Sequence, residues 1–288
     1  MRFLACAAAG TLIGAFLLAP ARGEQLRVKA MTFNIRLSKA NDGPNGWTQR
    51  ADMVREIFER SQADFVGVQE AWPDQIAFLR RGLPQYAHLG RSREADACKG
   101  EAVPLFYRHD RWRLDPEEFG VFWLSDTPDI PGSASWGNWI PRIVTWGRFL
   151  EKSSGRGIYV FNIHLDHLSE TSRVKSAAYL AKRIAERKHA DPAIVLGDFN
   201  SDETGTAVRA LVTDDSPAVL VDTFRVVHPN EASVGTFHAF TGARDGGKID
   251  HILVTPGATL LAAEIVHDNR QGRYPSDHFP VTAEVAFP

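Results

Sequence analysis

Short apolar runs with a two-residue period alternate along this chain with segments in which apolar residues recur every three or four positions. The first period is typical of β-strands and the second of helices with one buried face. Helices are predicted at 48–60, 73–81 and 172–189. Strands are predicted at 26–37 (ending near 34), 64–69, 86–89, 103–108, 143–150, 157–164, 193–196, 249–254, 262–267 and 281–287, and the stretch 119–124 is apolar and aromatic. In the third helix, Val174, Ala178, Ala181 and Ala185 share the face predicted to be buried.

Two segments of the chain resemble one another. Phe33-Asn34-Ile35 recurs as Phe161-Asn162-Ile163, and each copy precedes a predicted helix and a short apolar strand that ends in an acid. These acids, Glu70 and Asp198, each lie 36 positions after their asparagine. Two matched strand–helix–strand units predict a pseudo-two-fold α/β core with its polar strand ends at one rim.

The polar pair Asp198 and Asn200 directly follows the apolar run 194–196. Side chains two positions apart in extended backbone point the same way, so this carboxylate and this amide are predicted to face one spot. Alone, the pair is equally typical of a strand that ends in a turn. A functional site is favoured because polar clusters stand at other predicted strand ends and close to the end of the chain: Asn34, Gln69-Glu70, His164 with Asp166, Asp250-His251 and Ser276-Asp277-His278.

Four acids in these clusters suit a hard cation. Glu70, Asp198, Asp250 and Asp277 offer oxygen ligands, which favours Mg²⁺, with Mn²⁺ and Ca²⁺ as alternatives. Glu70 with Asn34 is the first choice for the ligand pair. Taken singly, Glu70 is equally well explained as a solvated acid at a strand end.

Three histidines, His164, His251 and His278, each stand beside or two positions from an acid. Together with the carboxylates they suit in-line attack of water on phosphorus, in which one group accepts a proton while an imidazolium and a metal stabilise charge on the phosphoryl oxygens. A zinc site is the competing chemical interpretation. It is less favoured because no H-x-x-x-H or H-E-x-x-H spacing occurs on a predicted helix.

The first 23 residues match a secretory signal peptide. Arg2 precedes an apolar stretch over 3–18, and Ala19-Pro20-Ala21 offers a cleavage site. A buried N-terminal helix is the alternative. We therefore expect residues 1–23 to be removed, a single domain over 24–288, and a periplasmic or secreted protein.

Composition narrows the choice of partners. The chain has 288 residues, 44% of them hydrophobic, as in ordinary globular proteins. Without residues 1–23, the chain keeps 31 basic and 35 acidic residues, a net charge of −4, which argues against electrostatic binding of long nucleic acid.

Removal of residues 1–23 would leave Cys98 without a cysteine partner, which excludes an intrachain disulfide. No later apolar run is long enough to span a bilayer, so we expect no stable membrane association and a monomer.

The ordered set of motifs resembles the endonuclease/exonuclease/phosphatase superfamily, whose fold is the DNase I-like fold. The motifs are Asn34, Gln69-Glu70, Asn162-x-His164, Gly197-Asp198-Phe199-Asn200, Ile249-Asp250-His251 and Ser276-Asp277-His278. The resemblance covers essentially the whole mature chain. It implies a four-layer α/β (α+β) sandwich, with two packed mixed β-sheets flanked by helices. It also implies Mg²⁺-dependent hydrolysis of phosphate esters without a covalent intermediate.

The resemblance also implies roles for single residues on the metal side of the site. Asn34 and Glu70 are similar to the family's metal-site residues. Asp277 is expected to help on the same side.

On the catalytic side, Asp198 resembles the residue that orients or deprotonates the attacking water, with Asn200 beside it on the phosphate. His278 resembles the histidine that contacts the phosphate, paired with Asp250. His164 is similar to the second histidine, which stabilises the transition state or assists the leaving group.

Further motifs resemble the small exported bacterial branch of the superfamily, which is similar to the deadenylases and sugar phosphatases. These motifs are Phe122-Trp123-Leu124-Ser125, 162–167 and Thr236-Phe237-His238. Arg36 departs from the DNA repair relatives, which carry an acid there. Glu101, Arg142 and Asn162 are predicted on the substrate side, where Arg142 would clamp a phosphate. Trp136 and Trp139 either stack on a sugar or base, or pin their loop.

The leading hypothesis is an exported, Mg²⁺-dependent phosphoesterase that acts on a small phosphorylated sugar or nucleotide. The alternatives are a secreted nuclease, a phospholipase C of the sphingomyelinase kind, and an inactive binding protein. No exposed aromatic hairpin is recognisable for the phospholipase, and the presence of Asp198, Asp250 and His278 argues against the inactive protein. His278→Ala is expected to fold and to lose nearly all hydrolysis.

Overall fold

The computed structural model describes residues 25–288, so the predicted signal peptide lies outside the described residues. Its strands form two six-stranded sheets. The first sheet runs in the order β11 (Thr259–Ile265), β12 (Val281–Phe287), β1 (Leu26–Asn34), β2 (Phe65–Gln69), β4 (Leu105–Arg108) and β3 (Tyr86–Leu89). The second runs in the order β5 (Trp112–Trp123), β6 (Ile143–Glu151), β7 (Gly157–His164), β8 (Ala193–Asp198), β10 (Asp250–Val254) and β9 (Val221–Asp222). Both sheets are mixed, because β1 is parallel to β2 and β7 is parallel to β8, whereas the other pairs are antiparallel.

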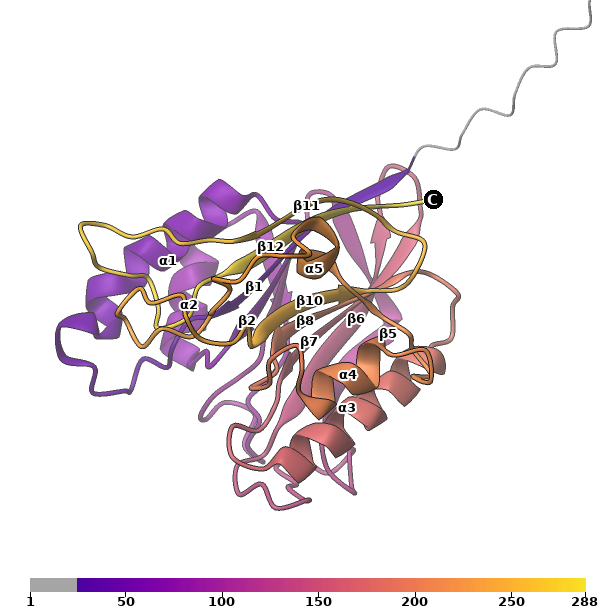
Figure 1. Ribbon diagram of the computed structural model, residues 1–288, viewed down its shortest axis with the longest axis horizontal. Coiled ribbons are helices and arrows are strands. Elements are labelled where there is room, and N and C mark those ends of the chain that lie inside the picture. Colours follow the sequence, from indigo (N-terminus) through magenta and orange to yellow (C-terminus); the bar gives the residue numbers. More distant parts are fainter. Residues whose placement is uncertain (1–24) are drawn as a thin grey trace, which may run out of the picture.

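Helices cover the outer faces of both sheets (Figure 1). Their bounds are η1 (Gly43–Asn45), α1 (Trp47–Ser61), α2 (Pro73–Gly82), α3 (Glu170–Ala185), α4 (Thr206–Val212) and α5 (Thr223–Val227). The side chains of α1 and α2 pack on the first sheet, and those of α3 and α4 pack on the second. The predicted four-layer sandwich is therefore confirmed. Within residues 25–288, no helix combines the length and hydrophobicity needed to cross a bilayer.

The central strands are apolar on both faces, which explains their layered packing. In β1, Val28 and Ala30 face the second sheet, while Met31 and Phe33 face α1. All four side chains are almost fully buried. A strand buried on both faces is typical of an inner sheet that is covered on each side.

The predicted buried face of α3 was wrong in part, because Ala181 is buried and Val174 is half-buried but the other two residues are not. Ala178 and Ala185 are exposed, whereas Leu180 and Ile184 lie in the core. These two residues offer more apolar area than alanine and therefore decide which face is buried. The helix also begins earlier than predicted, at Glu170, because the side chain of Ser169 accepts a hydrogen bond from the Ser172 N–H and caps its first turn.

The repeated sequence motif does correspond to two parallel strand pairs, one in each sheet, but its two asparagines are not equivalent. Asn34 is the last residue of β1 and pairs with Gln69, whereas Asn162 lies two residues before the end of β7 and pairs with Leu196. The Asn162 amide nitrogen donates to the carbonyls of Val68 (3.0 Å) and Pro104 (2.8 Å). Its oxygen accepts a hydrogen bond from Gln69 Nε2 (2.7 Å). Asn162 therefore ties the two sheets together.

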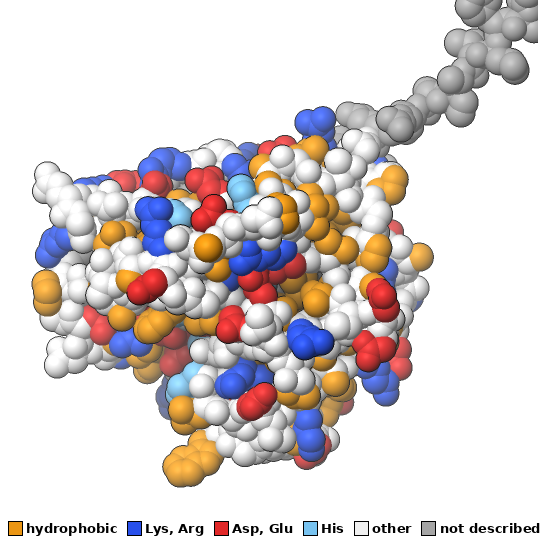
Figure 2. Space-filling view, viewed as in Figure 1, with side chains coloured by type: hydrophobic (Ala, Val, Ile, Leu, Met, Phe, Trp, Pro, Cys, Tyr) orange, Lys and Arg blue, Asp and Glu red, His pale blue; other side chains and the backbone are white. Residues whose placement is uncertain are grey.

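The surface carries charges of both signs. Figure 2 shows lysine and arginine interspersed with aspartate and glutamate over the face in view. No continuous basic stripe is visible on this face among the described residues. Mixed charges of this kind are ordinary for the surface of a globular protein. On this face they give no long basic track along which a polyanion could bind.

Gly67→Ala tests the close approach of the sheets. A Cβ at position 67 would lie 1.8 Å from Leu196 Cδ1 and 2.6 Å from Asn162 Oδ1. Both neighbours are fully buried, so we expect the free energy of unfolding in urea to fall by about 1–3 kcal/mol or more. Gly120→Ala is the matched control in β5, where the nearest atom would lie 3.4 Å away. Equal stability of the two variants would contradict this account.

Candidate functional site

A cavity of about 340 Å³ opens where the carboxyl ends of β1, β2, β7 and β8 meet. The carboxyl ends of parallel strands share one edge of a sheet, which is why the polar strand ends converge here. The segment that precedes β12 contributes as well. The lining residues are Arg36, Leu37, Glu70, Arg93, Glu101, Ile140, Arg142, His164, His167, Asp198, Asn200, Phe237, Ile249, Asp277 and His278.

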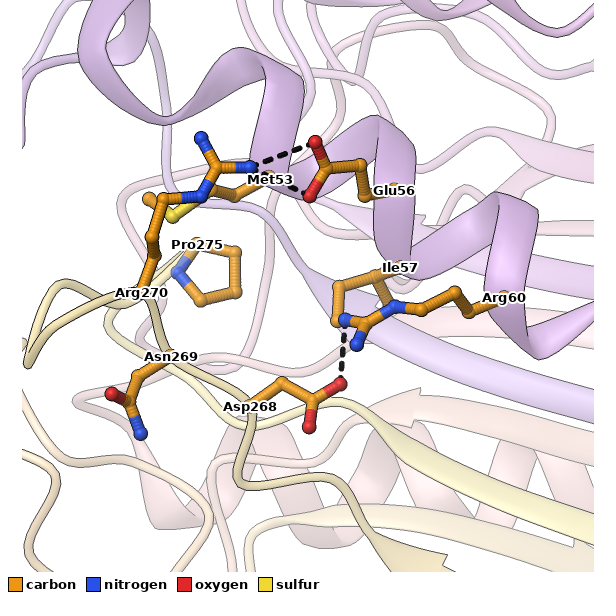
Figure 3. A pocket seen from close by; sticks show the side chains of 8 residues that line it. All are labelled: Met53, Glu56, Ile57, Arg60, Asp268, Asn269, Arg270 and Pro275. Atoms are coloured by element: carbon orange, nitrogen blue, oxygen red, sulfur yellow. Dashed lines mark hydrogen bonds and ion pairs between the residues drawn. The ribbon is translucent and has the colours of Figure 1, made fainter.

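A second cavity, of about 240 Å³, lies between α1 and the segment 268–275 (Figure 3). Its charged side chains neutralise one another, since Arg270 pairs with Glu56 at 2.8 Å and Arg60 pairs with Asp268 at 2.5 Å. None of the residues predicted to carry chemistry lines it. We therefore place the functional site in the larger cavity.

Asn34 connects the two sheets at the base of this cavity. Its Nδ2 donates to Glu70 Oε1 (3.1 Å) and to Asp198 Oδ2 (3.0 Å). Its Oδ1 accepts the backbone N–H of Arg36 at 3.0 Å. The amide therefore presents its nitrogen to the two carboxylates, so that here it orients them. The prediction that Asn34 itself binds a metal stays a prediction.

Asp250 and His278 form a buried pair. His278 Nδ1 lies 2.9 Å from Asp250 Oδ2, and Asp250 Oδ1 has no hydrogen-bond partner among residues 25–288. Burial alone would lower the pKa of His278, but the Asp250 carboxylate outweighs burial and raises this pKa to about 10. The imidazole is therefore a cation near neutral pH. Its Nε2 lies 3.8 Å from Asp198 Oδ2 and is available on the cavity side.

Asp198 is set up as a proton acceptor. It is buried and directly opposite Asp250 on the neighbouring strand. Burial and the Asp250 charge raise the pKa of Asp198 to about 7. Its Oδ1 accepts the backbone N–H of Asn200 at 2.8 Å, and this fixes the direction of the carboxylate. A carboxylate with a pKa near 7 suits general-base catalysis at neutral pH.

Two arginines, Arg142 and Arg93, also line the cavity. Arg142 is almost fully buried, and its guanidinium contacts Asp166 (3.4 Å) and His167 (2.9 Å). Arg93 pairs with Glu101 through two contacts of 2.7 and 2.8 Å. Burial, and then the charges of Arg142 and Arg93, lower the pKa of His164 well below its ordinary value. His164 is therefore neutral, 3.7 Å from Asp198.

Three cavity residues have left-handed backbone. Arg36, Glu70 and Asn200 have φ values of 53°, 60° and 46°. Each follows the end of a strand, and the left-handed turn aims its side chain along the rim. Asparagine tolerates this conformation, but arginine and glutamate do so at a cost in energy.

A model of the Endonuclease/Exonuclease/phosphatase family matches residues 31–278. The chain belongs to this family. The strand ends described above lie within the matched region, as does every predicted site residue. As a member of the family, the chain is a phosphoric ester hydrolase.

Solved structures of this family are similar over most of the chain. A family protein from Bacteroides thetaiotaomicron has a TM-score of 0.84 and 33% identity, and the match covers 92% of this chain and 96% of that one. A mannosyl-6-phosphatase from the same organism has a TM-score of 0.82 and 34% identity, with 90% of this chain and 100% of that one covered.

A viral protein is similar over a shorter stretch. The "Uncharacterized protein L388" of Acanthamoeba polyphaga mimivirus is 31% identical over 166 residues, which is 54% of this chain. The match spans 60% of that protein's length.

Enzymes of this family imply a divalent ion, and the donor set here fits one. Ligand atoms of Asp198, Asp250 and His278 lie within 4.8 Å of one another. A cation at this position would compete with the His278 imidazolium for Asp250, although Asp250 Oδ1 has no hydrogen-bond partner among residues 25–288. Glu70 and Asp277 on the cavity rim fit better, because burial raises the pKa of Asp277 and the nearby Glu70 charge adds to this effect. A cation between these carboxylates would relieve their mutual repulsion.

The fold brings together most of the predicted site residues but not all. Asn162 does not line the cavity, because its amide is fully engaged between the sheets. His251 lies in a separate buried cluster, 2.7 Å from Lys248 Nζ. Trp136 pins its loop, since its Nε1 donates to Asp126 at 2.7 Å. Trp139 is 95% exposed and does not line the cavity.

Sequence reasoning missed three lining residues: Arg93, His167 and Phe237. Arg93 lies in a loop crowded with charges, and only the folded chain shows that it pairs with Glu101. His167 and Phe237 belong to motifs that resemble the bacterial branch of the family, but the sequence indicated no function for either side chain. The signal that could have found the last two was their position beside His164 and within the Thr236-Phe237-His238 motif.

His278→Ala and the double variant Asp250→Asn/His278→Ala separate chemistry from folding. The single change leaves the Asp250 carboxylate buried without a partner, so we expect a loss of about 3–5 kcal/mol in the free energy of unfolding, a cost that the sequence did not indicate. The double change removes the charge, so stability should recover in part while hydrolysis stays absent. Urea unfolding and phosphate release measure the two effects. Wild-type hydrolysis by either variant would refute the site.

Proposed function

We propose that the chain is an exported, Mg²⁺-dependent phosphoesterase that hydrolyses a small phosphorylated sugar or nucleotide. The observation that carries the proposal is one cavity whose lining brings carboxylates together with arginine and histidine side chains. Its volume of about 340 Å³ is at the small end of ligand cavities. Similarity to a mannosyl-6-phosphatase supports a sugar phosphate, and the N-terminal pattern supports export.

The side chains of this site divide the reaction among them. Asp198 accepts the proton of a water molecule that attacks phosphorus in line with the leaving oxygen. The His278 cation, held by Asp250, stabilises charge on the phosphoryl oxygens. Mg²⁺, held by Glu70 and Asp277, would polarise the phosphoryl group when bound.

The leaving group departs beside His164 and Arg142. His164 is neutral there, so its ring N–H can donate a hydrogen bond to the leaving oxygen. This oxygen departs with the electron pair of the ester bond and takes a proton from solvent water, while Asp198 returns the proton that it accepted to solvent. The Arg142 guanidinium would bind an oxygen of the phosphate group that is being hydrolysed. Its contacts with Asp166 and His167 hold it in position. This arrangement needs no nucleophile from the protein, and a covalent intermediate is not required.

Two alternatives make contrasting demands on the surface. A secreted nuclease would need a continuous basic track, and the mixed charges of Figure 2 give no support for one on that face. A phospholipase C would need apolar side chains at the mouth. Trp139 is an exposed apolar side chain next to Ile140, and the same loop supplies Ile140 and Arg142 to the cavity. This exposed tryptophan, together with Phe237, which lines the cavity and is 48% exposed, is the observation that favours the phospholipase.

Hydrolysis assays separate these functions. The purified protein would be given a sugar phosphate monoester, a phosphodiester, plasmid DNA and sphingomyelin vesicles, each with Mg²⁺, with Mn²⁺ and with a chelator. We expect metal-dependent release of phosphate from the monoester, and its loss in chelator. Faster cleavage of DNA or sphingomyelin than of the monoester would overturn the substrate class. No turnover of any substrate would overturn the proposed enzyme.

The ion is tested separately from turnover. We expect Glu70→Gln and Asp277→Asn each to weaken Mg²⁺ binding by at least about tenfold in titration calorimetry, since each removes one anionic oxygen ligand. Glu56→Gln, in the cavity of Figure 3, is the control because it removes a carboxylate elsewhere. Unchanged affinity in both site variants would place the ion elsewhere.

A further inference from the structure

The Thr236-Phe237-His238 motif has no role in the mechanism above, although its backbone and side chains contact the segments that carry Asp250 and His278. Thr236 is fully buried and does not line the cavity. Its Oγ1 accepts two consecutive backbone N–H groups, from Ile249 at 3.0 Å and from Asp250 at 3.1 Å. Its backbone carbonyl accepts the N–H of Phe279 at 2.7 Å. One residue thus holds the backbone on both sides of the Asp250–His278 pair.

The next two residues continue this connection. Phe237 forms an isolated bridge with His278, and the two rings lie 5.1 Å apart. The backbone N–H of His238 donates to the carbonyl of Asp277 at 2.8 Å. The segment 236–238 therefore runs between the start of β10 and the chain that leads into β12.

This connection matters because the Asp250–His278 pair crosses from one sheet to the other. Asp250 begins β10 in the second sheet, and His278 precedes β12 in the first. No hydrogen-bonded ladder joins the two sheets here, so another element must fix the distance of 2.9 Å between the two side chains. A hydrogen bond of this length weakens quickly when its partners shift.

We propose that Thr236 is a positioning residue that sets the Asp250 carboxylate against the His278 imidazole through its hydroxyl group. The inference rests on the proposed function for its kinetic consequence. A hydroxyl oxygen has two lone pairs and can accept both N–H groups at once. Serine keeps this acceptor, whereas valine has nearly the same shape and lacks it.

Thr236→Val, Thr236→Ser and a control, Thr223→Val, test the proposal. Thr223 is an equally buried threonine beside β10, and its hydroxyl donates to the carbonyl of Ile252 at 2.8 Å, away from the pair. We expect Thr236→Val to lower kcat for the monoester by at least about tenfold with KM within about twofold, because Thr236 touches no substrate. Thr236→Ser should restore most of kcat, and Thr223→Val should keep it even where it lowers stability.

A second readout does not depend on turnover. The proton on His278 Nδ1 that bonds to Asp250 should give a downfield NMR resonance, assigned by its loss in Asp250→Asn. We expect the resonance in wild type, Thr236→Ser and Thr223→Val, and its shift or loss in Thr236→Val. An unchanged resonance in Thr236→Val, or a fall in kcat that Thr223→Val reproduces, would overturn the positioning role. A normal resonance pattern in a protein without hydrolysis would instead overturn the proposed function.

Discussion

The register between the two sheets is the constraint on which the site depends. Asn34 belongs to the first sheet and holds Asp198 of the second at 3.0 Å. His278 lies beside the first sheet and bonds to Asp250 of the second. A displacement of one sheet by a fraction of an ångström would separate both pairs. The close contact at Gly67 and the amide of Asn162 therefore serve the chemistry although neither touches the cavity.

Burial and neighbouring charges give chemically similar side chains different protonation states within a short distance. Asp198 and Asp250 are neighbours on two adjacent strands, and both side chains are almost fully buried. One carboxylate becomes a base with a pKa of about 7, while the other keeps His278 protonated. A third group, His164, stays neutral because burial, and then the charges of Arg142 and Arg93, lower its pKa. The acid–base roles thus follow from position and not from residue type, since two aspartates and two histidines divide into four distinct functions.

Apolar periodicity and strand-end polar residues are local signals, so they predicted most helices and strands and most of the rim, whereas the four layers were implied by the family resemblance. The sequence could not predict register: Phe161-Asn162-Ile163 repeats Phe33-Asn34-Ile35, yet only the pairing of strands shows that Asn162 stops short of the rim. Short helices were also not predicted. Because α4 and α5 span only 7 and 5 residues, each makes fewer than about two helical turns, which is too short for a helical period to be recognised. Arg93 was missed for a third reason, because its partner Glu101 is defined only when the loop is folded.

The left-handed backbone of Arg36 and Glu70 has a consequence for how this protein can change. Each such residue holds roughly 1–3 kcal/mol of conformational strain that the rest of the fold must offset. Glycine or asparagine at either position would relieve the strain but would remove a side chain from the rim. Selection for thermal stability alone would therefore favour glycine or asparagine at these two positions. If arginine and glutamate are retained in a thermally stable variant, this indicates that catalysis is under selection as well.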